Sequence, residues 1–480
     1  MVKDRQKNIA DIYAPETRPI RVLQFGEGAF LRAFADEMID AANAKGVFDG
    51  SIAVVKPRAH GTVDAFRAQS GLYTLLLRGV CGGETVNVSR VVKSVSRALH
   101  AYGDYDELCD VARLDTLQFI ISNTTEAGIL YDEDDRLELT PPESFPGKLA
   151  KLLYLRWQAH GKGLIIIPTE LIPDNGARLR ECVLRLAERW RLGSEFVRWV
   201  EEENIFCDTL VDRIVTGYPR DEAEEIFGRL GYNDALLDVA EPFGLWVIAS
   251  ERVEEVRERL PLDRAGLPVV FTGDARPYRE RKLRVLNGAH TSMALAAYLA
   301  GLDTVGECMS DHTLRRFIER AVFDEIVPFV PLPREEAETF ARSVLERFEN
   351  PFLRHMLLSI SVNSVPKWRA RVLPSLLDNV SAGRLPELLT FSFAALAAFY
   401  TVGERSGEPY TVRDSAKALD FFRKNGDLPS GTLIARLAAE REFWGTDLGE
   451  LAGFNEKAAG WLKVIRKNGA RSAIERVIAR

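Results

Sequence analysis

The sequence predicts an α/β protein in which a Rossmann-type doubly wound sheet domain is followed by an all-α C-terminal domain. Short β-branched runs alternate with helical patterns in the first half, which is typical of a parallel sheet covered on both faces. From about residue 282 onward the pattern is helical. The 480 residues are roughly three times the ~150 of a usual domain, which favours two domains. We divide the chain into a polar, surface-exposed N-terminal segment (1–17), the sheet domain (18–278) and a mainly helical substrate-binding domain (279–480).

Four apolar runs predict the strands of the sheet. They cover residues 20–25, 51–55, 117–122 and 163–168. Each run is short, rich in Val and Ile, and followed after a turn or loop by apolar residues at helical spacing. We therefore expect strands that are buried on both faces and joined by helices.

The second half predicts a succession of helices with no strand among them. Apolar residues recur at helical spacing in residues 287–300, 310–326, 334–348, 385–400 and 431–442. Proline and glycine turn signals separate these runs at residues 331–333, 403–409 and 425–426.

Charge and composition exclude several classes of protein. Sixty-three basic and 70 acidic residues give a net charge of −7 with both signs spread along the chain, so we expect no nucleic-acid partner. The N-terminus carries no apolar leader, and the longest apolar run, 388–402, is too short to span a bilayer. We expect a cytoplasmic protein that does not bind membranes.

The five cysteines predict neither a metal site nor a disulfide framework. They are widely separated and never form a C-x-x-C pair, so we interpret them as reduced thiols in the core. They are Cys81, Cys109, Cys182, Cys207 and Cys308.

A glycine turn follows the first strand and predicts a dinucleotide site. Gly26-x-Gly28 lets a pyrophosphate approach the backbone, and the helix that starts there offers free N–H groups and the positive end of its dipole. The third glycine of the usual fingerprint is absent, because position 31 is leucine. A glycine turn that binds no ligand is therefore the alternative.

The end of the second strand leaves the choice between NAD and NADP open. An acid normally holds the ribose hydroxyls there, but this chain has Lys56, with Arg58 two residues further on. These two cations favour the 2′-phosphate of NADP, and the alternative is that both are solvated surface charges.

Lys282, Asn287 and His290 form a candidate catalytic set. At 100° per residue they point to about 0°, 140° and 80° on one helix, so a single helix could present all three to one sector. Reduction of a carbonyl needs a proton donor and polar groups that stabilise the developing oxyanion, which lysine, asparagine and histidine can supply. A lysine acid near neutral pH needs burial or cationic neighbours, for which Arg281 and Arg284 are candidates. The alternative is a solvated lysine and a capping asparagine.

With these residues in view, the chain resembles the polyol-specific long-chain dehydrogenases and reductases, which include mannitol dehydrogenase. Four segments carry the resemblance, which extends over nearly the whole chain: Gln24–Phe34, Ser122–Ile129, Thr209–Asp221 and Glu280–Thr291. The family's Lys-x4-Asn-x2-His signature falls on the catalytic set, which implies that Lys282 is the general acid/base and that Asn287 and His290 polarise and orient the carbonyl.

The resemblance also implies a zinc-independent, NAD-linked reaction. The implied cofactor-binding residues are Gln24, Phe25, Gly26, Glu27, Gly28, Ala29 and Phe30, with Thr125 and Glu126 near the nicotinamide.

Two departures from the family pattern point to one of its branches. Mannitol dehydrogenase carries Cys-Asp-Asn after the strand near residue 168, and its asparagine helps to form the oxyanion site; this chain has Thr169-Glu170-Leu171. The branch that reduces tagaturonate to altronate also carries Glu-Leu here and a basic residue at position 56, and it is linked to NAD. We therefore expect NAD and a keto-uronate substrate, with Asn175 as the substitute oxyanion donor.

A keto-uronate carries a carboxylate, so its pocket needs a cation. Lys367 and Arg371 are the candidates, since they lie four residues apart and related dehydrogenases place a substrate-contacting lysine in a similar segment. A solvated basic helix is the alternative. Asp212 is a further candidate, either as a substrate or proton-relay residue or as the structural partner of Arg213.

Two other functions remain open from the sequence. One is a reductase of the same family that acts on fructuronate or a neutral ketose, and the other is a non-catalytic NAD-binding regulator. We draw no prediction of oligomeric state.

Overall fold

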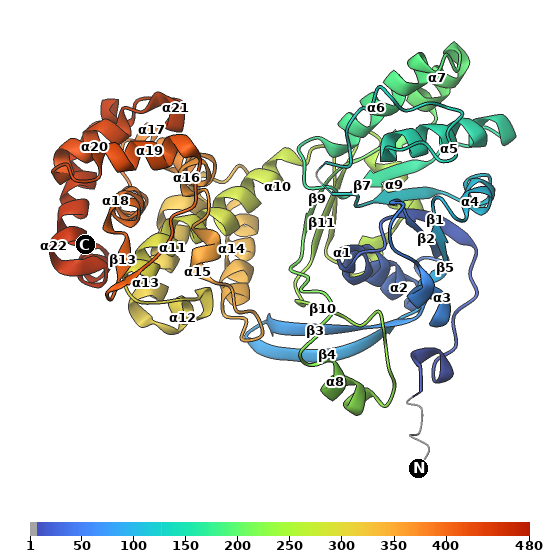
Figure 1. Ribbon diagram of the computed structural model, residues 1–480, viewed down its shortest axis with the longest axis horizontal. Helices are drawn as coiled ribbons and strands as arrows, with labels where there is room; N and C mark the ends of the chain where they lie inside the picture. The colour runs from blue at the N-terminus through green and yellow to red at the C-terminus, as the bar shows by residue number, and fades with distance from the viewer. Residues whose placement is uncertain (1–6, 126) are drawn as a thin grey trace. The chain divides into compact units, whose positions relative to one another are not determined.

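The computed structural model describes residues 7–125 and 127–480, which form two compact units (Figure 1). Unit 1 holds the chain up to Arg78 together with Val86–Ala275. Unit 2 holds Gly79–Thr85 and Arg276–Arg480. The two units are described separately below.

Unit 1 is built on a six-stranded sheet with the order β5-β2-β1-β6-β7-β8, and every neighbouring pair in it is parallel. Its strands are β1 (Ile20–Phe25), β2 (Ser51–Lys56), β5 (Val95–His100), β6 (Phe119–Ser122), β7 (Ile165–Pro168) and β8 (Ile205–Phe206). The chain runs outward from β1 in both directions, which is the doubly wound arrangement that the sequence predicted.

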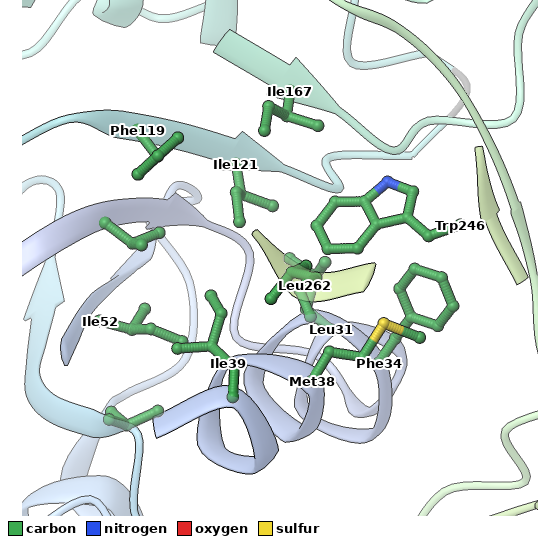
Figure 2. Close-up of a cluster of buried hydrophobic side chains, with 14 of the residues drawn as sticks. Leu31, Phe34, Met38, Ile39, Ile52, Phe119, Ile121, Ile167, Trp246 and Leu262 are labelled. Carbon is green, nitrogen blue, oxygen red and sulfur yellow. The ribbon is translucent and has the colours of Figure 1, made fainter. Parts of the chain in front are cut away.

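Alternate residues of the strands face two separate cores. Val22, Ile52 and Phe119 contribute to one, which packs against a helical run made of α1 (Ala29–Leu31), the π-helical segment η2 (Arg32–Asp36) and α2 (Glu37–Ala44). Figure 2 shows Leu31, Phe34, Met38 and Ile39 of this run pointing toward side chains from the sheet and from β11. Leu23 and Phe25 face the other core. Its helices are α4 (Tyr105–Ala112), α5 (Phe145–Ala159), α6 (Asn175–Arg189) and α7 (Ser194–Glu202).

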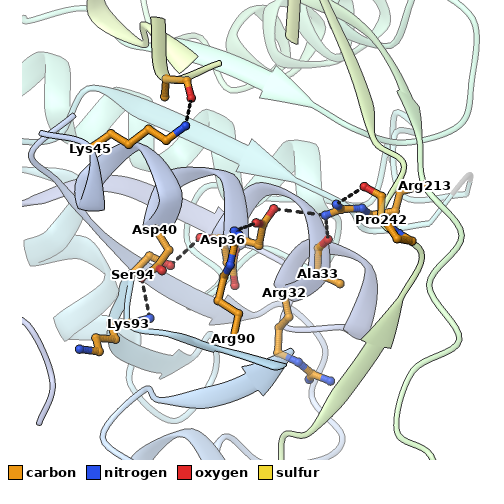
Figure 3. Close-up of polar contacts among 12 residues, drawn as sticks. Arg32, Ala33, Asp36, Asp40, Lys45, Arg90, Lys93, Ser94, Arg213 and Pro242 are labelled. Atoms are coloured by element: carbon orange, nitrogen blue, oxygen red, sulfur yellow. Dashed lines mark hydrogen bonds and ion pairs between the residues drawn. The ribbon is translucent and has the colours of Figure 1, made fainter. Parts of the chain in front are cut away.

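Polar contacts hold the same helical run in place (Figure 3). Ser94 Oγ donates to the carbonyl of Asp36 at 2.8 Å, and Arg213 donates to the carbonyls of Ala33 and Pro242. Arg213 also forms an ion pair with Glu37 at 3.2 Å. Its partners thus lie in η2, in helix α2 and in the chain before β11, so Arg213 ties these segments together.

Eight strands of unit 1 were not predicted from the sequence. Two are β5 and β8 of the parallel sheet, and six form the three-stranded sheets β10-β3-β4 and β12-β11-β9. Their bounds are β3 (Tyr73–Cys81), β4 (Glu84–Val92), β9 (Asp208–Asp212), β10 (Asp238–Ala240), β11 (Leu245–Ala249) and β12 (Val269–Thr272). Most of β4 is exposed on both faces. Val86 and Val88 do alternate with Asn87 and Ser89, a strand signal that sequence reasoning missed.

The remaining short elements of unit 1 are α3 (Asp64–Ala68), α8 (Ala223–Leu230), α9 (Val253–Arg259) and the 3-10 turns η1 (Ile9–Asp11) and η3 (Leu262–Ala265). The N-terminal segment is not wholly superficial, because Ile9 is fully buried against Leu72 and Tyr232. One buried apolar side chain is enough to anchor this segment. A single apolar residue in a polar stretch gives no periodic pattern from which its burial could be predicted.

Unit 2 is helical, as predicted. Its helices up to the middle of the unit are α10 (Arg276–Arg281), η4 (Lys282–Asn287), α11 (Gly288–Leu299), α12 (Val305–Ser310), α13 (His312–Arg320), η5 (Ala321–Ile326), η6 (Val327–Phe329), α14 (Arg334–Phe348) and α15 (Leu357–Ile360). The others are α16 (Ser364–Arg371), α17 (Leu373–Ser381), α18 (Glu387–Val402), α19 (Ala416–Asn425), α20 (Ser430–Ala438), α21 (Arg441–Trp444), η7 (Leu448–Glu450) and α22 (Phe454–Ile478).

Helix α18 is the core of unit 2. It is buried along nearly its whole length and packs against α11 and α22. The carboxylate of Glu325 accepts the N–H groups of Leu388 and Leu389 and so satisfies the first turn of α18. Within the described residues, no helix combines the length and the apolar composition needed to cross a bilayer.

Two expectations for the second half and for the thiols were wrong. Two-residue strands, β13 (Glu404–Arg405) and β14 (Glu408–Pro409), pair antiparallel where only a turn was expected. Cys81 is exposed at the tip of the β3–β4 hairpin, so one of the five free thiols lies outside the core. The hairpin tip belongs to unit 2, where the N–H of Gly82 donates to Glu346 at 3.3 Å.

Candidate active site

The glycine turn after β1 is locked by its neighbours. Gly26 has a φ of +122°, and a Cβ at this position would lie 2.8 Å from the carbonyl oxygen of Asn123. The N–H of Gly26 donates to the carbonyl of Val55 at 2.9 Å, and Gln24 Nε2 donates to the carbonyl of Gly26 at 3.1 Å. Only glycine fits here, because both the dihedral angle and the space exclude a side chain.

Gly28 has the opposite surroundings. It is exposed, and a Cβ added to it would meet no atom within 4 Å. It is the N-cap of the helical run that begins at Ala29, whose first N–H groups have no acceptor inside the helix. An open backbone at the positive end of a helix fits the pyrophosphate of a dinucleotide.

The predicted cofactor-binding residues at this turn fall into two groups. Gln24 and Phe25 are fully buried, and the ring centroid of Phe25 lies 5.1 Å from that of Phe145. These two residues therefore support the turn from inside and are not accessible to a cofactor. Ala29 and Phe30 are half-buried and Gly28 is exposed, so they remain available to a ligand.

Lys56, at the end of β2, is turned toward the glycine turn. Its Nζ lies 2.5 Å from Oε1 of Glu27. Arg58 is exposed and forms no ion pair with any described residue. The two cations that were predicted together therefore differ: one is compensated by an acid and the other is open to solvent.

The loop after β6 is held by a buried acid, Glu170. Its carboxylate accepts hydrogen bonds from Ser122 Oγ at 3.0 Å and from both the N–H and the hydroxyl of Thr124 at 2.9 Å. Burial raises the pKa of Glu170, and these hydrogen bonds oppose the shift. Thr125 follows with a φ of +80°, a costly conformation for a β-branched residue that is typical of functional sites. Glu126 lies outside the described residues.

A cavity of about 760 Å3 opens beside this loop at the carboxyl ends of β2 and β6. Its lining includes Arg58, Thr124, Thr125, Tyr131, Ser144 and Lys148. Burial lowers the pKa of Lys148 to about 8, and its amine donates to the carbonyl of Glu143 at 2.7 Å. This edge of a parallel sheet is where nucleotides bind in doubly wound folds.

Asn175 is not the oxyanion donor that the sequence suggested. Its side chain is fully buried and donates to the carbonyls of Pro168 and Glu170 and to the hydroxyl of Thr209. Its oxygen accepts from two further N–H groups. These contacts with β7, β9 and neighbouring residues use all of its hydrogen-bonding capacity, so none is left for a substrate. Asp212, at the end of β9 in the same unit, is also buried.

In unit 2, Lys282 and Asn287 mark the two ends of a π-helical turn, η4. The N–H of Gly288 donates to the carbonyl of Leu283, five residues earlier, and also to that of Val285. The predicted spacing of 100° per residue therefore does not hold across this segment. Inserted π turns are rare and recur at functional sites. Both Lys282 and Asn287 are half-buried.

The arginines that flank Lys282 are not free charges. Arg281 forms an ion pair with Glu336 at 2.7 Å and lies over the ring of Phe340. Arg284 pairs with Asp378. Neither can therefore play the part of an uncompensated cation that the sequence suggested for it.

His290 is buried, and its Nε2 has no hydrogen-bond partner among the described residues. Its ring stacks on Phe348 at 4.2 Å and meets the edge of His355 at 4.9 Å. Burial, followed by the charges of His355 and Arg347, holds the pKa of His290 well below its usual value, so its imidazole is neutral. A buried nitrogen without a protein partner is free to bind a ligand or a water molecule.

Asn287 has an unused side-chain amide, which forms no hydrogen bond with a described residue. Its carbonyl accepts the Thr291 hydroxyl at 2.9 Å. Gly288 brings α16 close, since a Cβ there would lie 2.9 Å from the carbonyl oxygen of Arg371. This contact places the Arg371 guanidinium 3.4 Å from the Thr291 hydroxyl.

Cations gather around His290. Lys367 and Arg371 lie on α16, as predicted, and burial lowers the pKa of both. The Lys367 amine donates to the carbonyl of Ile360 at 3.0 Å. Arg347, on α14, is also buried and acts electrostatically on His290. Sequence reasoning missed Arg347, whose only signal was a charged residue on the apolar face of a helix.

Comparison with known proteins identifies the family. The mannitol dehydrogenase Rossmann domain matches residues 20–262, and the mannitol dehydrogenase C-terminal domain matches residues 274–465. The chain belongs to the mannitol dehydrogenase family. It is an oxidoreductase, and altronate oxidoreductases from Escherichia coli strains UMN026 and IAI39 are 45% and 44% identical to it over 468 residues, which cover 95% of this chain and 96% of theirs.

Solved structures share the fold of this mannitol dehydrogenase family member. Mannitol 2-dehydrogenase of Pseudomonas fluorescens, in a ternary complex with NAD and D-mannitol, has a TM-score of 0.67 and 22% identity, covering 99% of this chain and 96% of that one. D-sorbitol dehydrogenase in substrate-free form has a TM-score of 0.76 and 22% identity, covering 95% of each chain.

Proposed function

We propose that the chain is an NAD-dependent tagaturonate reductase that interconverts D-tagaturonate and D-altronate in galacturonate catabolism. The observation that carries the proposal is in unit 2: a neutral, buried imidazole with an open Nε2 lies among cations and eight residues after Lys282. Relatives at 45% identity are named altronate oxidoreductase, which supports the sugar acid as substrate.

Unit 1 supplies the cofactor side of the reaction. The cradle at Gly28 fits a pyrophosphate, and the P. fluorescens relative was solved with NAD. When bound, the cofactor supplies the hydride that reduces the ketone carbon. We assign Thr125 and Glu126 to the neighbourhood of the nicotinamide, with Glu170 fixing the backbone of that loop.

Unit 2 supplies the acid–base chemistry. As the ketone becomes an alkoxide, its oxygen takes the proton of the Lys282 ammonium, and in the reverse direction the lysine amine accepts it. The amide of Asn287 and the neutral imidazole of His290 donate hydrogen bonds to this oxygen or to the neighbouring hydroxyl. A neutral imidazole donates without adding a charge that would compete with Lys282 for the substrate oxygen.

The carboxylate of the sugar acid binds to Arg371 and Lys367. Half-buried cations attract an anion more strongly than exposed ones, because solvent screens them less. Asp212 remains a structural residue in this account, and the second oxyanion donor is His290 in place of Asn175. The chain works in the cytoplasm, which agrees with five cysteines that form no disulfide.

The test is a substrate panel with the purified enzyme. NADH oxidation is measured with tagaturonate, fructuronate and fructose, and the panel is repeated with NADPH. We expect the highest kcat/KM with tagaturonate and NADH, and no change after dialysis against a chelator, because no step uses a metal. Faster reduction of fructuronate or fructose would assign another substrate, and NADH binding without turnover of any of them would favour a regulator.

A further inference from the structure

The end of β2 in unit 1 carries an unusual arrangement of charge. Doubly wound folds place an acid at this point, where it accepts hydrogen bonds from the ribose hydroxyls of NAD. Here the strand ends in Lys56, and the acid comes from the glycine turn: Glu27 lies between Gly26 and Gly28 and reaches Lys56 Nζ at 2.5 Å. The carboxylate therefore occupies the end of β2 although it belongs to another segment.

Both partners of this ion pair are held in position. The Arg32 guanidinium donates to the backbone carbonyl of Glu27 at 3.1 Å. The loop after β2 covers Lys56 so closely that a Cβ on Gly61 would lie 2.6 Å from Lys56 Cε. The two side chains are mostly buried, with 14% of Lys56 and 25% of Glu27 exposed.

The pair leaves an acceptor and no free cation. Glu27 Oε1 contacts the lysine, whereas Oε2 forms no hydrogen bond with a described residue. The charge of Lys56 is compensated by this contact, so it is not available to a phosphate. Arg58, the second cation that the sequence offered for the 2′-phosphate, is exposed and attracts an anion only weakly.

We propose that Glu27 accepts the ribose hydroxyls of the adenosine moiety and, held by Lys56, selects NADH over NADPH. This inference rests on the proposed function, since it concerns the same cofactor. A 2′-phosphate would bring about two negative charges next to the Glu27 carboxylate, which disfavours NADPH. The lysine that the sequence assigned to the 2′-phosphate instead positions the acid that rejects it.

Equilibrium titrations of the full-length enzyme with NADH and with NADPH, followed by nucleotide fluorescence, test the proposal. We expect the wild type to bind NADH at least about tenfold more tightly. Glu27→Gln should shift the ratio of the two Kd values toward NADPH by about tenfold or more. Lys56→Met should leave the ratio unchanged, because the acid remains and the lysine does not contact the phosphate; a selective loss of NADPH affinity would show that Lys56 binds the 2′-phosphate and would overturn the inference.

Glu107→Gln is the matched control, because it removes one carboxylate from an ion pair with Arg97 on the surface of the same unit. It should leave the ratio unchanged. Equal weakening of both nucleotides by Glu27→Gln would overturn the inference while leaving the proposed function intact, as would a wild type that binds NADPH as tightly as NADH. A wild type that binds neither nucleotide would instead refute the proposed function.

Discussion

Replacing Arg371 by glutamine separates recognition of the substrate carboxylate from catalysis. Arg371 is partly buried at the end of α16, next to the Thr291 hydroxyl and among the cations around His290. In the proposed complex it donates charge-assisted hydrogen bonds to the carboxylate. Glutamine keeps an N–H donor, but it is shorter than arginine and loses the charge and the fork-shaped geometry.

The expected loss follows from the strength of such a bond. A hydrogen bond to a charged group contributes about 1.5–3 kcal/mol, which corresponds to a loss of about 10- to 150-fold in kcat/KM for tagaturonate. Fructose has no carboxylate, so its kcat/KM should change by less than about threefold. The loss should appear mainly in KM, because the reacting carbon is held by other residues.

Steady-state kinetics gives the ratio of variant to wild-type kcat/KM for tagaturonate and for fructose. Thermal unfolding shows whether the variant is folded. Arg369→Gln is the control, since Arg369 is an exposed arginine on the same helix. This substitution should leave kcat/KM unchanged for both substrates. An equal loss with tagaturonate and fructose would refute the assignment, because it would mean that Arg371 supports the fold around Gly288 and does not bind the carboxylate.

Three further substitutions test other parts of the account. Gly26→Ala places a Cβ 2.8 Å from the Asn123 carbonyl at a φ of +122°, so it should destabilise the fold by about 2 kcal/mol or more and abolish NADH binding, as seen by thermal unfolding and titration. Glu170→Ala removes the acceptor for Thr124 and should lower kcat at least tenfold, with Glu170→Gln retaining more activity; an unchanged kcat would contradict its role. Burial raises the pKa of Asp36 to about 7, so the folded state holds a proton that the unfolded state releases near pH 4, and the free energy of unfolding should fall as pH rises from about 4 to 7. Asp36→Asn should flatten that fall in urea unfolding, and an unchanged slope would show that other groups cause it.

The parts of the fold that depend on short stretches of sequence could be predicted. The first strand, the glycine turn and the helix after it follow from a run of apolar residues, two glycines and helical spacing. The structure adds why Gly26 is required, through its approach to Asn123. The helical character of unit 2 followed equally from periodicity.

The parts that depend on distant partners could not be predicted. Asn175 was a reasonable oxyanion donor by its position in the chain, yet Thr209 and two backbone carbonyls use its amide. The same is true of Lys56. The sequence offered it as a cation for the 2′-phosphate, but it pairs with Glu27, which lies 29 residues away in sequence. Which partner satisfies a polar side chain is decided by tertiary packing.

The π turn at Lys282–Asn287 was missed for a different reason. Angles on a helical wheel assume a regular α-helix. One inserted residue rotates the side chains that precede the π turn relative to those that follow it. The three residues do lie on one continuous helical run, η4 followed by α11, but the directions in which the sequence placed them relative to one another were wrong.

Substitution of Lys282 by methionine tests the central claim most directly, because methionine keeps the length of the side chain and removes the amine. The measurement is single-turnover reduction of tagaturonate by bound NADH, with NADH affinity determined in parallel. The account predicts unchanged NADH affinity and a rate at least about 100-fold lower. A variant that binds NADH and reduces tagaturonate at the wild-type rate would contradict it.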